Sequence, residues 1–176
     1  MIVRDTLREV LRLYRLRLAG THGVSHWGRV MENGRRLAAT SGADLDVVEL
    51  FAVLHDACRF DDDVDRDHGR RAAVLASELR GRTFDLGDRR FALLRAALAG
   101  HVDGLTSSNA TVGTCWDADR LDIGRVGTDP IPRYMSTEAG RDARVIAWAT
   151  ERALDRHVPG LVLGEWGIDL SVRSRT

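Results

Sequence analysis

The chain has 176 residues, 44% of them hydrophobic, which is enough for one compact domain with its own core. Its 26 basic and 26 acidic residues leave no net charge. This balance argues against non-specific binding to nucleic acid, which usually needs an excess of basic residues. No apolar run approaches the roughly 18 residues of a membrane-spanning helix, and the first residues do not resemble a secretory signal. We therefore expect a cytoplasmic protein that does not bind membranes.

Every basic residue is an arginine, and the sequence contains no lysine and no glutamine. This composition is typical of a bacterium with a GC-rich genome. Its chemical consequence is that a side-chain cation in contact with an anionic substrate must be an arginine or a protonated histidine. The two cysteines, Cys58 and Cys115, lack the spacing of a metal site, and we expect reduced, buried thiols.

The spacing of apolar residues predicts an all-α fold of about six to seven helices, without internal repeats. The acidic segment 59–67 and the proline-containing segment 124–136 are expected to be loops. Ser25 is the expected N-cap of the second helix and Thr137 that of the last. Beyond Pro159, apolar residues predict a short strand or an extended arm docked on the body. The predicted helices cover residues 4–18, 26–39, 45–57, 68–80, 86–99, 112–123 and 137–157.

Separate segments carry side chains that are suited to binding a metal ion. His26 lies in the first turn of the second predicted helix, and His55 and Asp56 follow the apolar run of the third. Asp119 lies within the sixth. A divalent ion needs neutral imidazoles and carboxylates that converge from rigid elements. Two histidines and two aspartates would make a mixed nitrogen and oxygen site for Mn, Fe, Co, Ni, Zn or Mg, unlike a sulfur-rich structural zinc site.

Three motifs follow one another in the chain: His-Trp-Gly-Arg-Val at 26–30, His-Asp at 55–56, and Asp-Ala-Asp-Arg-Leu-Asp at 117–122. In this order they resemble the motifs of the HD superfamily of metal-dependent phosphohydrolases, and the chain looks closest to small bacterial members. Each motif alone is weak, but the ordered set is specific.

The resemblance covers about residues 20–125 and implies one compact helical HD domain over residues 1–176. The last long helix and the C-terminal arm, 137–176, are expected to pack on that motif-bearing core. Carried over residue by residue, the resemblance implies that the four ligands of a divalent metal ion are His26, His55, Asp56 and Asp119.

Three further residues are candidates for a second metal ion or for catalysis. Many HD enzymes place a histidine, here His101, near the scissile phosphate or on a second metal; a histidine that caps a helix C-terminus is the alternative. His68 could bind a second metal or a phosphate, or be a surface residue at a helix start. Asp122 lies one helical turn from Asp119 and faces the same way.

The water-activating group is left open by the sequence. Several nucleotide-cleaving HD enzymes carry a glutamate three residues after the His-Asp pair, where this chain has Arg59. Asp122, Asp61 and His101 are therefore the candidates for the general base. Arginines near the ligands could hold phosphate oxygens or be ordinary surface residues. The candidates for phosphate contacts are Arg29, Arg59 and Arg70.

The resemblance implies hydrolysis of a phosphomonoester or nucleotide-type substrate through a metal-activated water. The partner is then a small phosphorylated molecule such as a nucleotide, and the oligomer is a monomer or a homodimer. A first alternative is an HD-fold di-iron oxygenase with six ligands, against which the short interval between Asp56 and His68 argues. A second alternative is a non-catalytic regulatory domain that binds a nucleotide, against which the intact ligand set argues.

Overall fold

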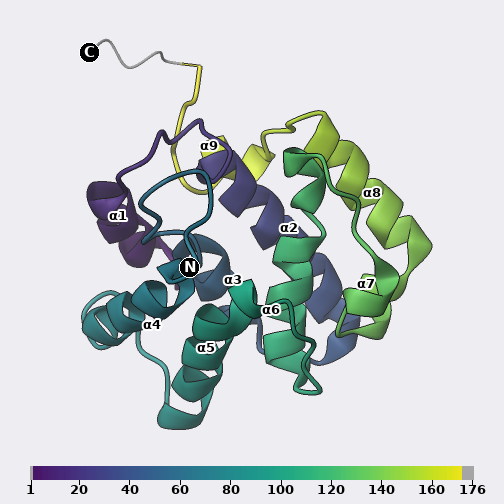
Figure 1. Ribbon diagram of the computed structural model, residues 1–176. Helices are drawn as coiled ribbons and strands as arrows, with labels where there is room; N and C mark the ends of the chain where they lie inside the picture. Colours follow the sequence, from purple (N-terminus) through teal and green to yellow (C-terminus); the bar gives the residue numbers. More distant parts are fainter. Residues whose placement is uncertain (1, 172–176) are drawn as a thin grey trace.

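The computed structural model describes residues 2–171, and almost all of their regular structure is helical (Figure 1). These residues form nine α-helices, seven of which have ten residues or more, and they contain no strand. The predicted all-α fold is confirmed. The α-helices are α1 (Arg4–Leu13), α2 (Val24–Ser41), α3 (Leu45–Leu54), α4 (His68–Leu79), α5 (Asp88–Gly100), α6 (Ala110–Arg120), α7 (Glu138–Arg141), α8 (Ala143–Leu154) and α9 (Gly160–Gly164). Three short 3-10 helices are η1 (His101–Asp103), η2 (Ile123–Val126) and η3 (Pro132–Tyr134).

Helix α3 lies at the centre of the molecule. Every residue from Val47 to Leu54 is buried, as expected of a helix that is apolar nearly all round. Helices α1, α2, α5 and α6 pack around it, and α4 packs on α5 (Figure 1). Because α3 ends in the middle of this bundle, the residues that follow Leu54 are delivered into the interior.

Helix α2 lies unusually close to its neighbours because of one glycine. A Cβ atom at Gly34 would lie 2.5 Å from Val48 Cγ1 and 3.6 Å from Ala118 Cβ. The adjacent Asn33 donates from its side-chain amide to the Ala118 carbonyl, at 3.0 Å. The long α2 is therefore held against both α3 and α6, the two other helices that carry the motif residues.

The predicted boundaries were wrong at two places near the N-terminus. Helix α1 ends at Leu13 instead of residue 18, because Tyr14 is extended and its hydroxyl donates to the His22 carbonyl at 2.8 Å. Helix α2 begins at Val24 with Gly23 as the N-cap, so Ser25 lies inside the first turn and does not cap the helix.

The predicted long last helix is two helices with separate caps. Thr137 caps α7, as its hydroxyl accepts from the Gly140 amide at 2.9 Å, but Asp142 then interrupts the helix and caps α8. After Pro159 the chain forms α9, with Leu161 and Val162 buried, in place of the predicted strand or extended arm. The part of that arm beyond residue 171 lies outside the described residues.

The possibility of a membrane span was tested over residues 2–171. None of the helices there combines the length and the apolar character that crossing a bilayer requires.

Asp117 ties α6 to the segment that leads into α7. Its buried carboxylate accepts from the amides of Ser136 and Thr137, both at 2.7 Å, and from the Thr137 hydroxyl at 2.8 Å. The same hydroxyl caps α7 through the Gly140 amide. One carboxylate therefore fixes the return of the chain from the end of α6.

We expect Asp117→Ala to lower the free energy of unfolding by about 2–4 kcal/mol, because it leaves two backbone amides without an acceptor. Urea denaturation followed by circular dichroism measures this change. Asp85→Ala, at an exposed position, is the matched control and should change stability by less than about 0.5 kcal/mol. Equal stabilities of the two variants would contradict this role of Asp117.

Candidate metal centre

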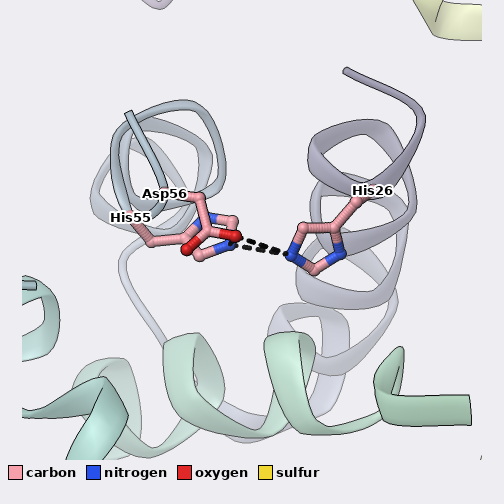
Figure 2. A group of neighbouring side chains, drawn as sticks. All are labelled: His26, His55 and Asp56. Atoms are coloured by element: carbon pink, nitrogen blue, oxygen red, sulfur yellow. Dashed lines mark hydrogen bonds and ion pairs between the residues drawn. The ribbon is translucent and has the colours of Figure 1, made fainter. Parts of the chain in front are cut away.

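Three helices bring the motif residues together in the interior. His26 comes from the first turn of α2, His55 and Asp56 directly follow α3, and Asp119 lies in the last turn of α6. His26 and His55 are fully buried, and Asp56 is 3% exposed. Figure 2 shows the imidazole of His26 directed at His55 and Asp56 across the space between α2 and the end of α3.

These four residues form what we call the first cluster. Nε2 of His26 lies 3.0 Å from Nε2 of His55. Oδ2 of Asp56 lies 3.5 Å from the first of these nitrogens and 3.6 Å from the second. Oδ1 of Asp119 lies 3.4 and 3.9 Å from the same two nitrogens. Two ligands at right angles, each about 2.1 Å from an ion, are about 3.0 Å apart, so these spacings fit a divalent cation.

A second cluster shares Asp56 with the first. Its other oxygen, Oδ1, lies 3.1 Å from Nε2 of His68, which in turn lies 2.8 Å from Nε2 of His101. His26, His55 and Asp56 form one group with metal-ligand spacing, and Asp56, His68 and His101 form another. The short interval between Asp56 and His68 therefore does not keep the two side chains apart. It was wrong to hold this interval against a di-iron site with six ligands.

The protonation of the four histidines follows from their other ring nitrogens. Nδ1 of His26 faces a carboxylate oxygen of Asp122 at 2.7 Å. In His55, His68 and His101, Nδ1 faces the backbone carbonyls of residues 52, 65 and 98, respectively. Since carboxylate and carbonyl oxygens only accept hydrogen bonds, each Nδ1 carries the proton. A neutral ring held in this way presents the lone pair of its Nε2 to the cluster, which is the form of histidine that binds a metal.

The Nε2 atoms also face one another in pairs. His26 and His55 make one such pair at 3.0 Å, and His68 and His101 make the other at 2.8 Å. Two neutral rings with their protons on Nδ1 would repel each other at these distances through their lone pairs, and a cation shared between them would remove the conflict. The donor set therefore fits a metal ion.

The charges of the ligands match the same role. Burial lowers the pKa of His55 to about 3 and also lowers that of His101, so both rings are neutral at pH 7. Burial alone would raise the pKa of Asp56, but the nearby histidines outweigh it and hold the pKa well below its usual range. For Asp119 the opposing effects of burial and of His55 and Arg125 bring the pKa to about 2. Neutral imidazoles and ionised carboxylates are the forms that coordinate cations.

Asp122 lies behind His26 and is not part of either cluster. Its Oδ2 accepts from His26 and from Nη2 of Arg29 at 3.0 Å, and its Oδ1 accepts from Nε of Arg29 at 2.6 Å. The carboxyl is 1% exposed. Asp122 is therefore placed to orient the imidazole, as carboxylates behind metal-bound histidines do, and its carboxylate faces His26 and Arg29 instead of lying in either cluster.

Two of the three arginines predicted to contact phosphate point elsewhere. Arg29 is buried, and its third donor nitrogen is bonded to the His157 carbonyl at 2.8 Å, so it joins α2 to the end of α8. Arg70 lies on the exposed side of α4 and pairs with Asp67 at 2.9 Å. These two predictions are corrected: both arginines have structural or surface positions.

A cavity of about 260 Å³, here called the metal cavity, opens onto the clusters. Its walls include Asp56, His68, His101 and Asp119 together with the side chains of Arg59, Arg66 and Arg125. A larger cavity of about 770 Å³ lies beside α7 and shares no residue with the clusters.

Arg59 is held in place by the loop that follows the His-Asp pair. It donates to the carbonyls of Asp61 at 3.2 Å and Asp63 at 2.6 Å, and its Nη1 lies 3.6 Å from Oδ1 of Asp56. Arg66 and Arg125 were missed by the sequence reasoning. The spacing of Arg125, three residues after Asp122, was the available signal, because a continued helical turn returns to the same face.

Comparisons with known proteins support the same architecture. No protein-family model and no curated protein matches the sequence. Among solved structures, the chain is similar to the crystal structure of a predicted HD superfamily hydrolase from an uncultured Thermotogales bacterium. The two chains are 27% identical, the match covers 94% of this chain and 93% of the other, and the TM-score is 0.65. The fold and the meeting of the motif residues therefore confirm the resemblance of this chain to the HD superfamily of hydrolases.

Proposed function

We propose that this protein is a metal-dependent phosphohydrolase acting on a small phosphomonoester or nucleotide-type substrate. The observation that carries the proposal is the convergence of four histidine Nε2 atoms and the carboxylates of Asp56 and Asp119 beside a cavity whose walls include three arginines, together with Asp63 and Asp65. A site of this kind attracts a cation first and a phosphate second. The likeness to a predicted HD superfamily hydrolase supports the reaction class, while the phosphate specificity rests on the arginines.

A divalent ion held by the first cluster would supply a water of lowered pKa, about 7, and a charge that polarises a phosphoryl oxygen. The chain itself contributes the remaining functions. Asp56 and Asp119 hold the negative charge that retains the ion. Arg66 and Arg125 face the same cavity and provide donors for phosphate oxygens, and Arg59 keeps Asp56 oriented.

The sharing of Asp56 by both clusters makes metal stoichiometry the first test. Asp119→Asn should reduce binding at the first cluster, His101→Gln at the second, and Asp56→Asn at both. We expect wild-type protein purified without added metal and then loaded with Mn²⁺, Co²⁺, Ni²⁺ or Mg²⁺ to hydrolyse members of a phosphomonoester panel, and chelation to abolish turnover. Elemental analysis and phosphate release measure these outcomes.

Turnover should fall by on the order of a hundredfold or more in Asp56→Asn and Asp119→Asn. Arg95→Ala, which removes an exposed guanidinium on α5, is the control and should leave metal content and turnover unchanged. Full metal content in Asp56→Asn, or phosphate release that survives chelation, would overturn the proposal.

Asp122 allows a separate test of how His26 is oriented. We expect Asp122→Asn to weaken metal binding by about 10–100-fold, because the amide no longer holds His26 Nδ1 by a charged hydrogen bond. The measurement is competition with a fluorescent chelator, with urea denaturation to check that the variant folds. An unchanged metal affinity in a folded variant would exclude the orienting role.

A second candidate function is a di-iron oxygenase, because six residues with Asp56 shared between the clusters approach one another. This reading expects about two iron atoms per chain and consumption of dioxygen in the presence of substrate. We expect the hydrolase instead, with phosphate release that is independent of dioxygen. Two measurements separate these functions: phosphate release under anaerobic conditions, and dioxygen consumption in air with an oxygen electrode. Turnover that is lost without dioxygen would favour the oxygenase.

A further inference from the structure

A second cavity adjoins the metal cavity at Arg125. It has a volume of about 190 Å³ and lies between the start of α2 and the end of α8. Arg125 lines both cavities, so the second cavity lies directly beside the metal cavity. Its polar walls, which we call the arginine pocket, consist of Thr21, Ser25, Arg29, Arg125 and Arg156.

The arginine pocket carries more positive than negative charge. Arg29 is neutralised by Asp122. Arg125 is 4.0 Å from Asp119 and 3.9 Å from Asp122, too far for hydrogen bonds, and both carboxylates already serve the first cluster or His26. Arg156 has no carboxylate within 4.0 Å among residues 2–171.

One buried donor in this pocket has no acceptor. Nε of Arg125 is buried and makes no hydrogen bond within the described residues, although Nη1 donates to the Asp122 carbonyl at 3.1 Å. Buried donors in folded proteins nearly always have a partner, and an unpaired one points to a missing water or anion. Arg125 is the residue that the two cavities share.

Arg156 adopts a backbone conformation that favours glycine. With φ of 50°, it is the one residue other than glycine with positive φ in the described chain. It follows α8, where a glycine would end the helix with less strain. A residue with a strained backbone among the lining residues of a cationic pocket is an observation from which a function can be inferred.

We propose that the arginine pocket binds a second anionic group of the substrate, so that the substrate is a phosphomonoester bearing another phosphate or a carboxylate. The proposal rests on the proposed function: the scissile phosphate occupies the metal cavity, while Arg125 and Arg156 hold the second anion, with the hydroxyls of Ser25 and Thr21 as further donors. Guanidinium groups suit this role because they present several donors to phosphate or carboxylate oxygens.

The kinetic test uses substrate pairs that differ by one anionic group. Adenosine 3′,5′-bisphosphate is compared with AMP, and 3-phosphoglycerate with glycerol 3-phosphate. In at least one pair, we expect the wild-type kcat/KM to be on the order of tenfold higher for the member that carries the second anionic group, mainly because its KM is lower. Added salt should reduce this preference. The pair that shows the preference indicates whether the second anionic group is a phosphate or a carboxylate. Equal kcat/KM within both pairs would overturn the proposal.

Variants at Arg156 separate charge from backbone structure. Arg156→Gly removes the guanidinium and relieves the positive φ, so it should fold at least as well as wild type yet lose the preference. Arg156→Lys keeps a positive charge and should restore much of it. Arg95→Ala should keep the wild-type ratio. A preference that persists in Arg156→Gly would refute the role of this residue.

A binding measurement keeps this proposal distinct from the hydrolase assignment. Calorimetric titration of metal-free protein with each member of the two pairs requires neither metal nor turnover. The pocket is supported, even if no phosphoester is cleaved, when the member with the second anionic group binds more tightly and this difference is lost in Arg156→Gly and regained in Arg156→Lys. Equal affinities within both pairs would overturn the pocket even if the protein is a hydrolase.

Discussion

The Nδ1 hydrogen bonds of four histidines are the constraint on which the site depends. Each Nδ1 faces an oxygen that only accepts, so it carries a proton, and a neutral ring keeps its lone pair on Nε2. The fold brings these Nε2 atoms together in two pairs beside the carboxylates of Asp56 and Asp119. A cation is the partner that neutral rings in this arrangement would share. The rest of the structure, from the central α3 to the close packing of α2, holds the histidines in that position, as a preformed metal site requires.

The all-α fold and the elements carrying the ligands were predictable because periodicity records burial. The apolar residues of segment 45–57 predicted a helix, and the placement of His55 and Asp56 at its end followed directly; its central position became evident only from its packing. Helix ends were less predictable, since they depend on contacts between distant segments. Tyr14 ends α1 because its hydroxyl donates to the His22 carbonyl. Asp142 divides the predicted last helix because its side chain accepts from the amides of Arg144 and Val145 and so caps α8. Neither contact leaves a periodic signal.

The limits at the site have a similar origin. Sequence order suggested which residues meet, but it did not show the direction in which a side chain points. Asp119 and Asp122 were expected to share a helical face, yet α6 ends at Arg120, and one carboxylate lies beside His26 while the other lies behind it. The arginines were harder still, because a chain whose basic residues are all arginine offers no contrast between functional and surface positions. Arg29 and Arg125 can be told apart only by the partners that each one has in space.

The same arginines bear on how the site changes when it binds a cation. Arg59 lies 3.6 Å from Asp56 and Arg125 lies 4.0 Å from Asp119, so each guanidinium partly balances a carboxylate of the first cluster. A divalent ion would satisfy those carboxylates more directly, because it would lie nearer to them and carry twice the charge. The attraction between the carboxylates and the arginines would then weaken, which would leave more of the arginines' positive charge for an anion in the adjoining cavities. Metal binding would in this way strengthen the binding of an anion, in addition to the attraction that Arg125 and Arg156 exert without a metal.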